Sequence, residues 1–225
     1  MTEVTLVDSM GTDLTVANAA RVSFNKESSF DVMQMGVMLK AKDEKLINFL
    51  ARHNHFTPFT HCMITMKEKV PLFVARQRFK HCIGFCYNEI SRRYVDDKPE
   101  FYMPDDWREQ ASDKKQGSSD NSVNINPTSL MIDEYKQSVD KALWTYQHLL
   151  RLGVCPEQAR MVLPQSMYTE YYVTGSLQAW SRAYLLRTSS TAQKEIKDLA
   201  IKWDEIIEPL FPKSWVALLK TKKEN

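Results

Sequence analysis

The segment RQRFKHCIGFCYNEISRRY, residues 76–94, is the most cationic stretch of the chain, and we expect the remaining elements to be arranged around it. It holds five Lys or Arg side chains but one carboxylate, Glu89, and it follows the apolar run 70–75. Clustered positive charge among core residues is not typical of an ordinary solvated face. Because the net charge of the whole chain is only +2, an anion-binding field must come from such a local cluster.

The second half of this segment predicts a ligand-facing strand. If residues 88–95 are extended, then Glu89, Ser91 and Arg93 project from one face, because alternate side chains of a strand point the same way. The rigid fork of arginine donors suits phosphate, so this face could hold a phosphorylated ligand. The alternative is a surface strand with a Glu–Arg pair that contributes little energy.

The first half predicts a helix. Pro71 suits the first position of a helix that continues to about residue 81. Gln77, Lys80 and His81 would then share one face, together with a nearby Arg76. This face is either a second wall of the same site or a solvated basic surface.

Further along the chain, arginines interrupt otherwise apolar helices at Arg160, Arg182 and Arg187, and Ser176 and Gln178 lie nearby. A buried arginine needs a partner, and this local excess of cations makes ligand anions the candidates. The alternative is that these side chains reach solvent at the helix ends.

Histidine and cysteine spacing predicts no metal site. His53, His55 and His61 lie close together, but no CxxC or HExxH spacing accompanies them. His55 is better placed as a hydrogen-bonding group. Cys82 and Cys86 lie near cations, which can lower a thiol pKa and make a nucleophile, although core or incidental cysteines are the favoured explanation.

The hydrophobic periodicity predicts one domain, residues 1–225, of mixed helices and strands. A polar stretch, 105–128, is expected to be a mobile surface loop. The chain has no signal-peptide pattern, no apolar run of membrane-spanning length and no GxGxxG or P-loop motif, and its four cysteines suggest reduced thiols in a cytoplasm. Strands are expected at 4–7, 62–69, 88–95 and 168–173, and helices at 14–22, 42–53, 71–81, 130–152, 157–162, 177–186 and 191–207.

Seven segments, taken in order, resemble the flavin-dependent thymidylate synthases, the ThyX family. They are AARVSF (19–24), HFTPFTH (55–61), PLFVARQ (71–77), NEISRRY (88–94), EFY (100–102), ARMVLPQSMYTEYYVTGS (159–176) and LLRTSSTAQKEI (185–196).

The resemblance implies an α+β fold, a mostly antiparallel sheet packed with helices, and a homotetramer with sites between subunits. It implies methylation of dUMP to dTMP, with methylenetetrahydrofolate as carbon donor and FAD, reduced by NADPH, as hydride carrier. Arg187 would be catalytic, favouring an ionised uracil N3. The dUMP-binding residues would be Gln77, Arg78, Lys80, Glu89, Ile90, Ser91, Arg92, Arg93, Arg160 and Arg187. The FAD-binding residues would be His55, Thr57, Lys80, His81, Cys82, Ser176, Leu177, Gln178 and Arg182.

The chain departs from the family pattern mainly on the flavin side. Lys80-His81-Cys82 stands where the family has Arg-His-Arg, and Ser176, Gln178 and Arg182 replace Asn, Arg and Asn. These departures predict weak flavin retention and a divergent, virus-encoded member that acts in the host cytoplasm. Two alternatives remain, a homologue that binds nucleotide or flavin without turnover and a nucleic-acid-binding protein, although a net charge of +2 argues against the latter.

Overall fold

A computed structural model describes residues 2–33, 36–95, 97–111, 118–123 and 128–220. Two compact units make it up. The smaller unit contains Met1–Glu3, Lys69–Lys80 and Asn88–Tyr171. The larger unit contains Val4–Glu68, His81–Tyr87 and Tyr172–Asn225. The single domain expected from the sequence stays a prediction.

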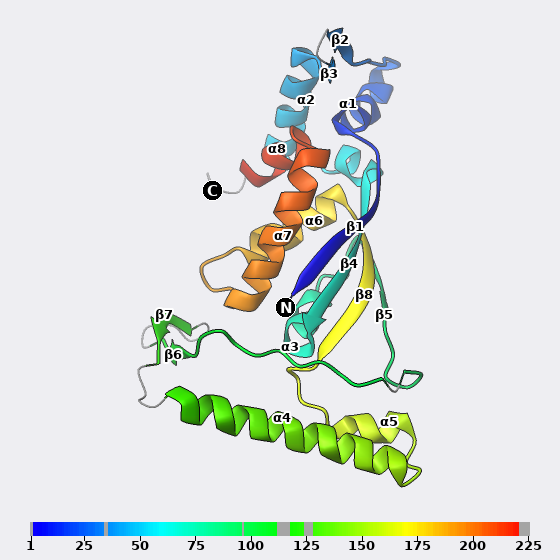
Figure 1. Ribbon diagram of the computed structural model, residues 1–225. Helices are drawn as coiled ribbons and strands as arrows, with labels where there is room; N and C mark the ends of the chain where they lie inside the picture. Colours follow the sequence, from blue (N-terminus) through cyan, green and yellow to red (C-terminus); the bar gives the residue numbers. More distant parts are fainter. Residues whose placement is uncertain (1, 34–35, 96, 112–117, 124–127, 221–225) are drawn as a thin grey trace. The chain divides into compact units, whose positions relative to one another are not determined.

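The main sheet has four strands in the order β1 (Glu3–Met10), β4 (Met63–Pro71), β8 (Tyr168–Ser176) and β5 (Phe85–Glu89) (Figure 1). The alternation predicted for the second strand is confirmed, because Cys62, Ile64 and Met66 are fully buried while their neighbours are half-buried. The mixed helix and antiparallel-sheet class expected from the sequence is also confirmed.

Helices of the larger unit enclose an aromatic core. Its helical elements include α1 (Asp13–Arg21), η1 (Val22–Phe24), α2 (Ala41–Arg52) and η2 (Thr57–His61). The C-terminal helices are α6 (Leu177–Arg187), α7 (Lys194–Leu210) and α8 (Ser214–Lys220), and α6 packs against both of the others (Figure 1). Trp180, Trp203 and Trp215 are fully buried among them.

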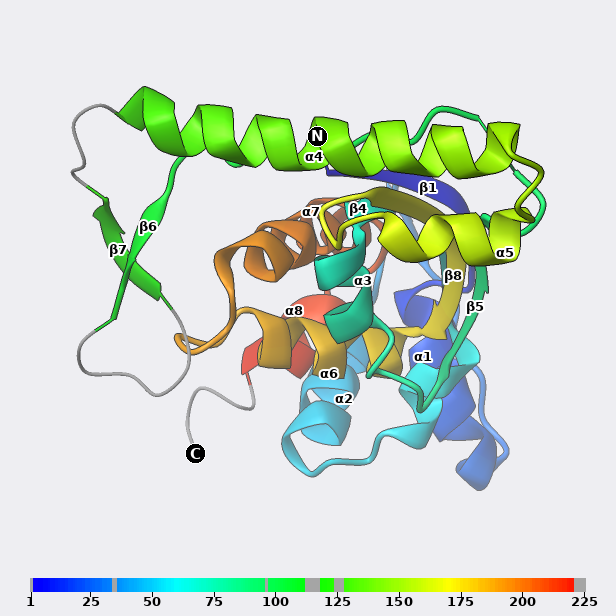
Figure 2. The same cartoon turned by 90° about the horizontal axis from the view of Figure 1, so that it is seen from below.

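The smaller unit combines α3 (Leu72–Arg78) with α4 (Thr128–Arg151), which packs on α5 (Pro156–Ala159) and η3 (Arg160–Val162) (Figure 2). The start of α3 is held in place because Leu72 N–H donates to Met167 C=O at 2.9 Å and Phe73 N–H donates to Gln165 C=O at 3.1 Å. The predicted loop at 105–128 contains two short paired strands, β6 (Arg108–Gln110) and β7 (Ser118–Ser122), and parts of it lie outside the described residues.

Three expected boundaries are wrong. The helix predicted over 191–207 begins at Lys194, with Gln193 as its N-cap, and helix α8 was not predicted at all. The helix predicted to reach residue 81 ends at Arg78. The strand predicted over 168–173 continues through Gly175 to Ser176. Only glycine fits at position 175, because a Cβ there would lie 2.4 Å from the ring of Phe85.

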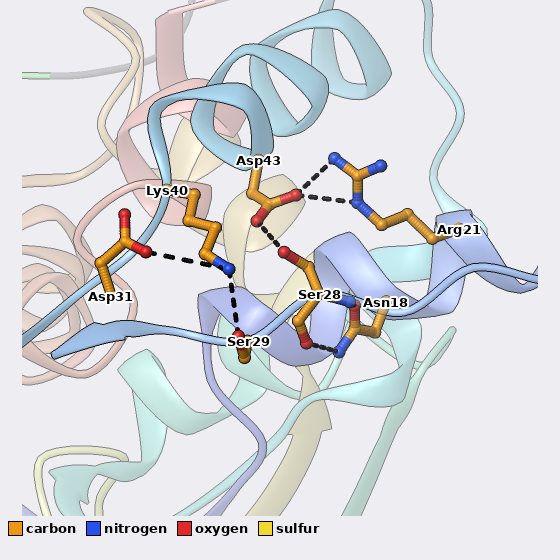
Figure 3. Close-up of polar contacts among 7 residues, drawn as sticks. All are labelled: Asn18, Arg21, Ser28, Ser29, Asp31, Lys40 and Asp43. Carbon is orange, nitrogen blue, oxygen red and sulfur yellow. Dashed lines mark hydrogen bonds and ion pairs between the residues drawn. The ribbon is translucent and has the colours of Figure 1, made fainter.

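A polar network holds α1, α2 and the segment between them together (Figure 3). Asp43, fully buried in the first turn of α2, accepts hydrogen bonds from Nε and Nη2 of Arg21 and from Oγ of Ser28. Lys40 adds a hydrogen bond to Ser29 at 3.0 Å. The network positions the pair of strands β2 (Asp31–Met33) and β3 (Gly36–Met38), which carries exposed apolar side chains.

We predict that Arg21→Ala lowers the free energy of unfolding by about 3 kcal/mol, because it leaves the buried carboxylate of Asp43 without its cationic partner. Urea-induced unfolding measures the change. Lys194→Ala is the matched control: its partner Asp198 and Lys194 itself are both largely exposed, so the loss there should stay below about 0.5 kcal/mol. Equal losses in the two variants would contradict the structural role given to Arg21.

Candidate functional site

A cavity of about 640 Å³ in the smaller unit gathers much of the cationic segment. We call it the arginine cavity. It is lined by Leu72, Arg76, Glu89, Ile90, Ser91, Arg92, Arg93, Arg160, Met161, Leu163, Gln165, Met167 and Thr169.

The chain reaches this cavity by leaving the sheet. Strand β5 ends at Glu89, and Ile90 N–H donates to Glu170 C=O at 2.9 Å. The C=O of Ser91 then accepts from the N–H groups of Tyr94 and Val95 at 3.0 and 3.2 Å, which closes a turn. The extended conformation predicted for 88–95 is therefore wrong beyond residue 89. Because the chain turns, Ser91, Arg92 and Arg93 all line the cavity, although a strand would alternate them.

Two of the charged residues are held by neighbours. A carboxylate oxygen of Glu89 accepts from Oγ1 of the buried Thr169 at 2.6 Å, which orients the carboxylate. Nη1 of Arg92 donates to both the C=O and the carboxylate of Asp97 at 2.6 and 2.7 Å. Arg92 is therefore largely neutralised within the protein.

The guanidinium groups of Arg76, Arg93 and Arg160 are less engaged by carboxylates of the protein, so they are available to a ligand. Arg93 donates from Nη2 to the Tyr94 hydroxyl at 2.9 Å, and the carboxylate of Glu157 lies 3.9 Å from its Nη1. In the part of the chain that the structure describes, no ion pair engages Arg76 or Arg160. With four arginines and a single carboxylate in its lining, the cavity favours an anion.

Six of the ten residues expected to bind dUMP thus line one cavity, namely Glu89, Ile90, Ser91, Arg92, Arg93 and Arg160. The other four do not: Gln77 and Arg78 belong to α3, Lys80 follows that helix, and Arg187 belongs to the larger unit. Arg78 is fully buried. Sequence reasoning did not select Gln165 or Thr169, although both lie within the matched segment 159–176.

A second cavity, of about 230 Å³, lies in the larger unit beside α6, and we call it the α6 cavity. Gln178 and Arg182, both expected at the flavin, line it. So do Leu50, Ala51, Asn54, Phe56, Phe59, Ser181, Leu185 and Leu218. His55 and Thr57 are exposed and flank Phe56 in the chain.

The lining of the α6 cavity fits part of a flavin. Oε1 of Gln178 is buried without a hydrogen-bond partner in the described chain, so it can accept from a donor on a ligand. The aromatic and aliphatic side chains in the same lining suit a flat ring. A complete FAD exceeds this volume, so the cavity would enclose only a portion of it.

The remaining flavin-side candidates have mixed surroundings. Ser176 caps α6 by accepting from Ala179 N–H at 3.2 Å, and Leu177 is fully buried with its N–H donating to Cys62 C=O. Cys82 is exposed in a turn. Nε of Arg187 donates to Nε2 of His81 at 2.8 Å.

Within the described residues, no group of three or more His, Cys, Asp or Glu is arranged to hold a metal ion. The helices described there include none that is both long and apolar enough to cross a membrane.

The arginine-lined cavity of this α+β fold has the size and charge that suit a small anionic molecule. A model of the family described as thymidylate synthase complementing protein matches residues 5–213. The chain is 38% identical over 218 residues to the flavin-dependent thymidylate synthase of Thermosipho africanus, covering 96% of this chain and 90% of that protein. It is 37% identical over 214 residues to the enzyme of the same name from Thermus thermophilus, covering 95% of this chain and 74% of the relative.

Solved structures agree with these relatives. The UMP/dUMP methylase PolB from Streptomyces cacaoi, bound with 5-Br dUMP, superposes with a TM-score of 0.82 and 28% identity, covering 96% of this chain and 94% of that one. Its structure bound with 5-Br UMP gives a TM-score of 0.83. This chain belongs to the family of flavin-dependent thymidylate synthases. The expected family, fold class and enzyme class are therefore confirmed.

The cysteines differ in reactivity. Burial, reinforced by the negative charge of Asp13, raises the pKa of the Cys62 thiol to about 12. Cys82, Cys86 and Cys155 are exposed. Cys62 is therefore a core residue and no nucleophile at neutral pH.

We predict that Ellman's reagent at pH 8 modifies Cys82, Cys86 and Cys155 rapidly and Cys62 only after unfolding, since Cys62 is both inaccessible and almost wholly protonated. Mass spectrometry of the labelled peptides identifies the modified positions. Comparable labelling rates for all four thiols of the folded protein would show that Cys62 is not buried as described.

Proposed function

We propose that this chain methylates dUMP to dTMP, taking the carbon from methylenetetrahydrofolate and using FAD, reduced by NADPH, as hydride carrier. The proposal depends on the arginine cavity. Its lining has more cations than carboxylates, and the chain belongs to a family of thymidylate synthases. A nucleoside monophosphate offers the matching dianionic phosphate.

The phosphate is proposed to bind between Arg93 and Arg160, with the Ser91 hydroxyl as a further donor. These arginines can give paired N–H bonds to phosphate oxygens. Glu89, already held by Thr169, then accepts from hydroxyl or N–H groups of the nucleotide. Gln77, Arg78 and Lys80 stay candidates on the strength of the family resemblance.

Flavin is proposed to bind with part of its ring system in the α6 cavity. Gln178 would accept a hydrogen bond there, and Arg182 would lie at the wall of the same cavity. When bound, FAD supplies the hydride that completes the methyl group. The other candidates from the resemblance are His55, Thr57, Lys80, His81, Cys82, Ser176 and Leu177.

Arg187 is proposed to act at the uracil ring. A fixed cation stabilises negative charge that develops on the base as N3 ionises, and the C5 carbon then becomes a better nucleophile. The residue lies at the C-terminal end of α6.

A homotetramer is proposed as the working assembly, following the family resemblance. Exposed apolar side chains support it, because such surface is commonly covered in an oligomer. They gather on η1 and the β2–β3 pair, where Val32 is 86% and Phe24 is 76% exposed.

We predict that Arg160→Ala raises the KM for dUMP by about 10- to 100-fold, because one charge-assisted hydrogen bond to phosphate is lost. Initial rates at varied dUMP give the value. Arg92→Ala should have a smaller effect, since Asp97 already binds that guanidinium. Arg151→Ala, at the end of α4 and outside the cavity, is the matched control and should change KM by less than about twofold. A similar KM in all three variants would contradict the phosphate assignment.

We predict that the purified enzyme oxidises NADPH in a dUMP-dependent reaction that yields dTMP, and that Arg187→Ala abolishes dTMP formation. Chromatography of the nucleotides measures the product, and the flavin absorption band measures cofactor binding. Bound flavin without dTMP would instead favour the homologue that binds without turnover. Near-normal turnover by the Arg187 variant would refute its role at the uracil.

A further inference from the structure

A hydrogen bond between two residues 106 positions apart joins the cationic segment to the end of α6. Nε of Arg187 donates to Nε2 of His81 at 2.8 Å, and both side chains are half-buried. Family resemblance placed His81 at the flavin and Arg187 at the uracil, so it gave no reason to expect this contact.

The contact determines the protonation of His81. A guanidinium nitrogen can only donate, because arginine stays charged in proteins. Nε2 of His81 must therefore accept, which leaves the ring proton on Nδ1 and the imidazole neutral. A protonated imidazole would bring a second N–H and a second positive charge against the guanidinium.

The backbone around His81 is also anchored. The Tyr87 hydroxyl donates to the His81 C=O at 2.8 Å, and Nη2 of Arg182 donates to the Ile83 C=O at 2.9 Å. The segment that carries His81 is thereby tied to β5 by one hydrogen bond and to α6 by the other. An imidazole on such an anchored segment can hold a flexible arginine side chain in one orientation.

We propose that His81 is a positioning residue: it fixes the guanidinium plane of Arg187 by accepting a hydrogen bond from Nε. Arginine has a long side chain with many rotamers, and its charge assists a reaction only where it is held in place. The inference rests on the proposed function, because it needs the proposed role of Arg187 at the uracil.

The test compares two substitutions of His81. His81→Leu removes the acceptor and should lower kcat for dTMP formation by about 100-fold, with a smaller change in the KM for dUMP. His81→Gln supplies a carbonyl oxygen as acceptor and should retain kcat within roughly tenfold of the unsubstituted enzyme. His148→Leu, on α4, is the matched control and should leave kcat unchanged. Melting curves from circular dichroism establish that each variant is folded.

A double variant separates positioning from an independent role. Arg187→Lys serves as the background, because it keeps a cation and some turnover but has no Nε donor; if His81 acts through Arg187, adding His81→Leu to Arg187→Lys causes no further loss of kcat. Nitrogen-15 NMR of labelled histidine detects the hydrogen bond independently of enzyme activity. At pH 8, Nε2 of His81 should show the chemical shift of an unprotonated nitrogen that accepts a hydrogen bond, and this chemical shift should change in Arg187→Ala.

Each failure has a distinct signature. An active unsubstituted enzyme with undiminished kcat in His81→Leu, or additive losses in the double variant, overturns the inference and leaves the proposed function standing. A folded His81→Gln variant as impaired as His81→Leu, or a protonated Nε2, overturns it as well. Absence of dTMP from the unsubstituted enzyme overturns the proposed function and this inference with it.

Discussion

The hydrogen bond from Ile90 N–H to Glu170 C=O, 2.9 Å long, marks the point on which the arginine cavity depends. Up to Glu89 the chain obeys the geometry of a sheet, in which successive side chains point to opposite faces. Beyond Ile90 the Ser91 carbonyl accepts hydrogen bonds from the backbone N–H groups of Tyr94 and Val95, and the chain turns. Because a turn can direct neighbouring side chains to the same side, the hydroxyl of Ser91 and the guanidinium groups of Arg92 and Arg93 all line the arginine cavity. The sheet holds the start of this segment in place, and the turn brings its charged groups together.

Sequence patterns predicted those elements whose packing is regular. In α4 and in the strand around Ile64, apolar residues recur at the regular spacing of a helix or a strand, so the hydrophobic periodicity of the sequence predicts both elements. Where one specific contact overrides the pattern, prediction failed. The polar 88–95 segment looked extended because the Ser91 carbonyl contacts cannot be seen in composition. Helix α8 was not predicted, although Trp215 within it is fully buried.

The candidate site shows the same division. Residues close together in sequence, such as Glu89, Ser91 and Arg93, were selected together and do line one cavity. The contact between His81 and Arg187 joins distant segments, and no local pattern encodes it. Gln178 was predicted only in part. The family resemblance pointed to its position, but only the structure shows that its amide oxygen is buried without a hydrogen-bond partner in the described chain. A neutral acceptor stands there in place of a cation, which changes the hydrogen-bonding character of that wall.

The close approach of Phe85 to Gly175 ties together two positions 90 residues apart in the chain. A Cβ at Gly175 would lie 2.4 Å from two ring carbons of Phe85, closer than side-chain atoms come in practice. The phenyl ring also packs edge-on against Trp180 at 5.0 Å between centroids, so it has little room to withdraw. Residue 175 can therefore gain a side chain only in a lineage where residue 85 has first become small. The two positions should vary together as these sequences diverge, and the order of the two changes is fixed by sterics.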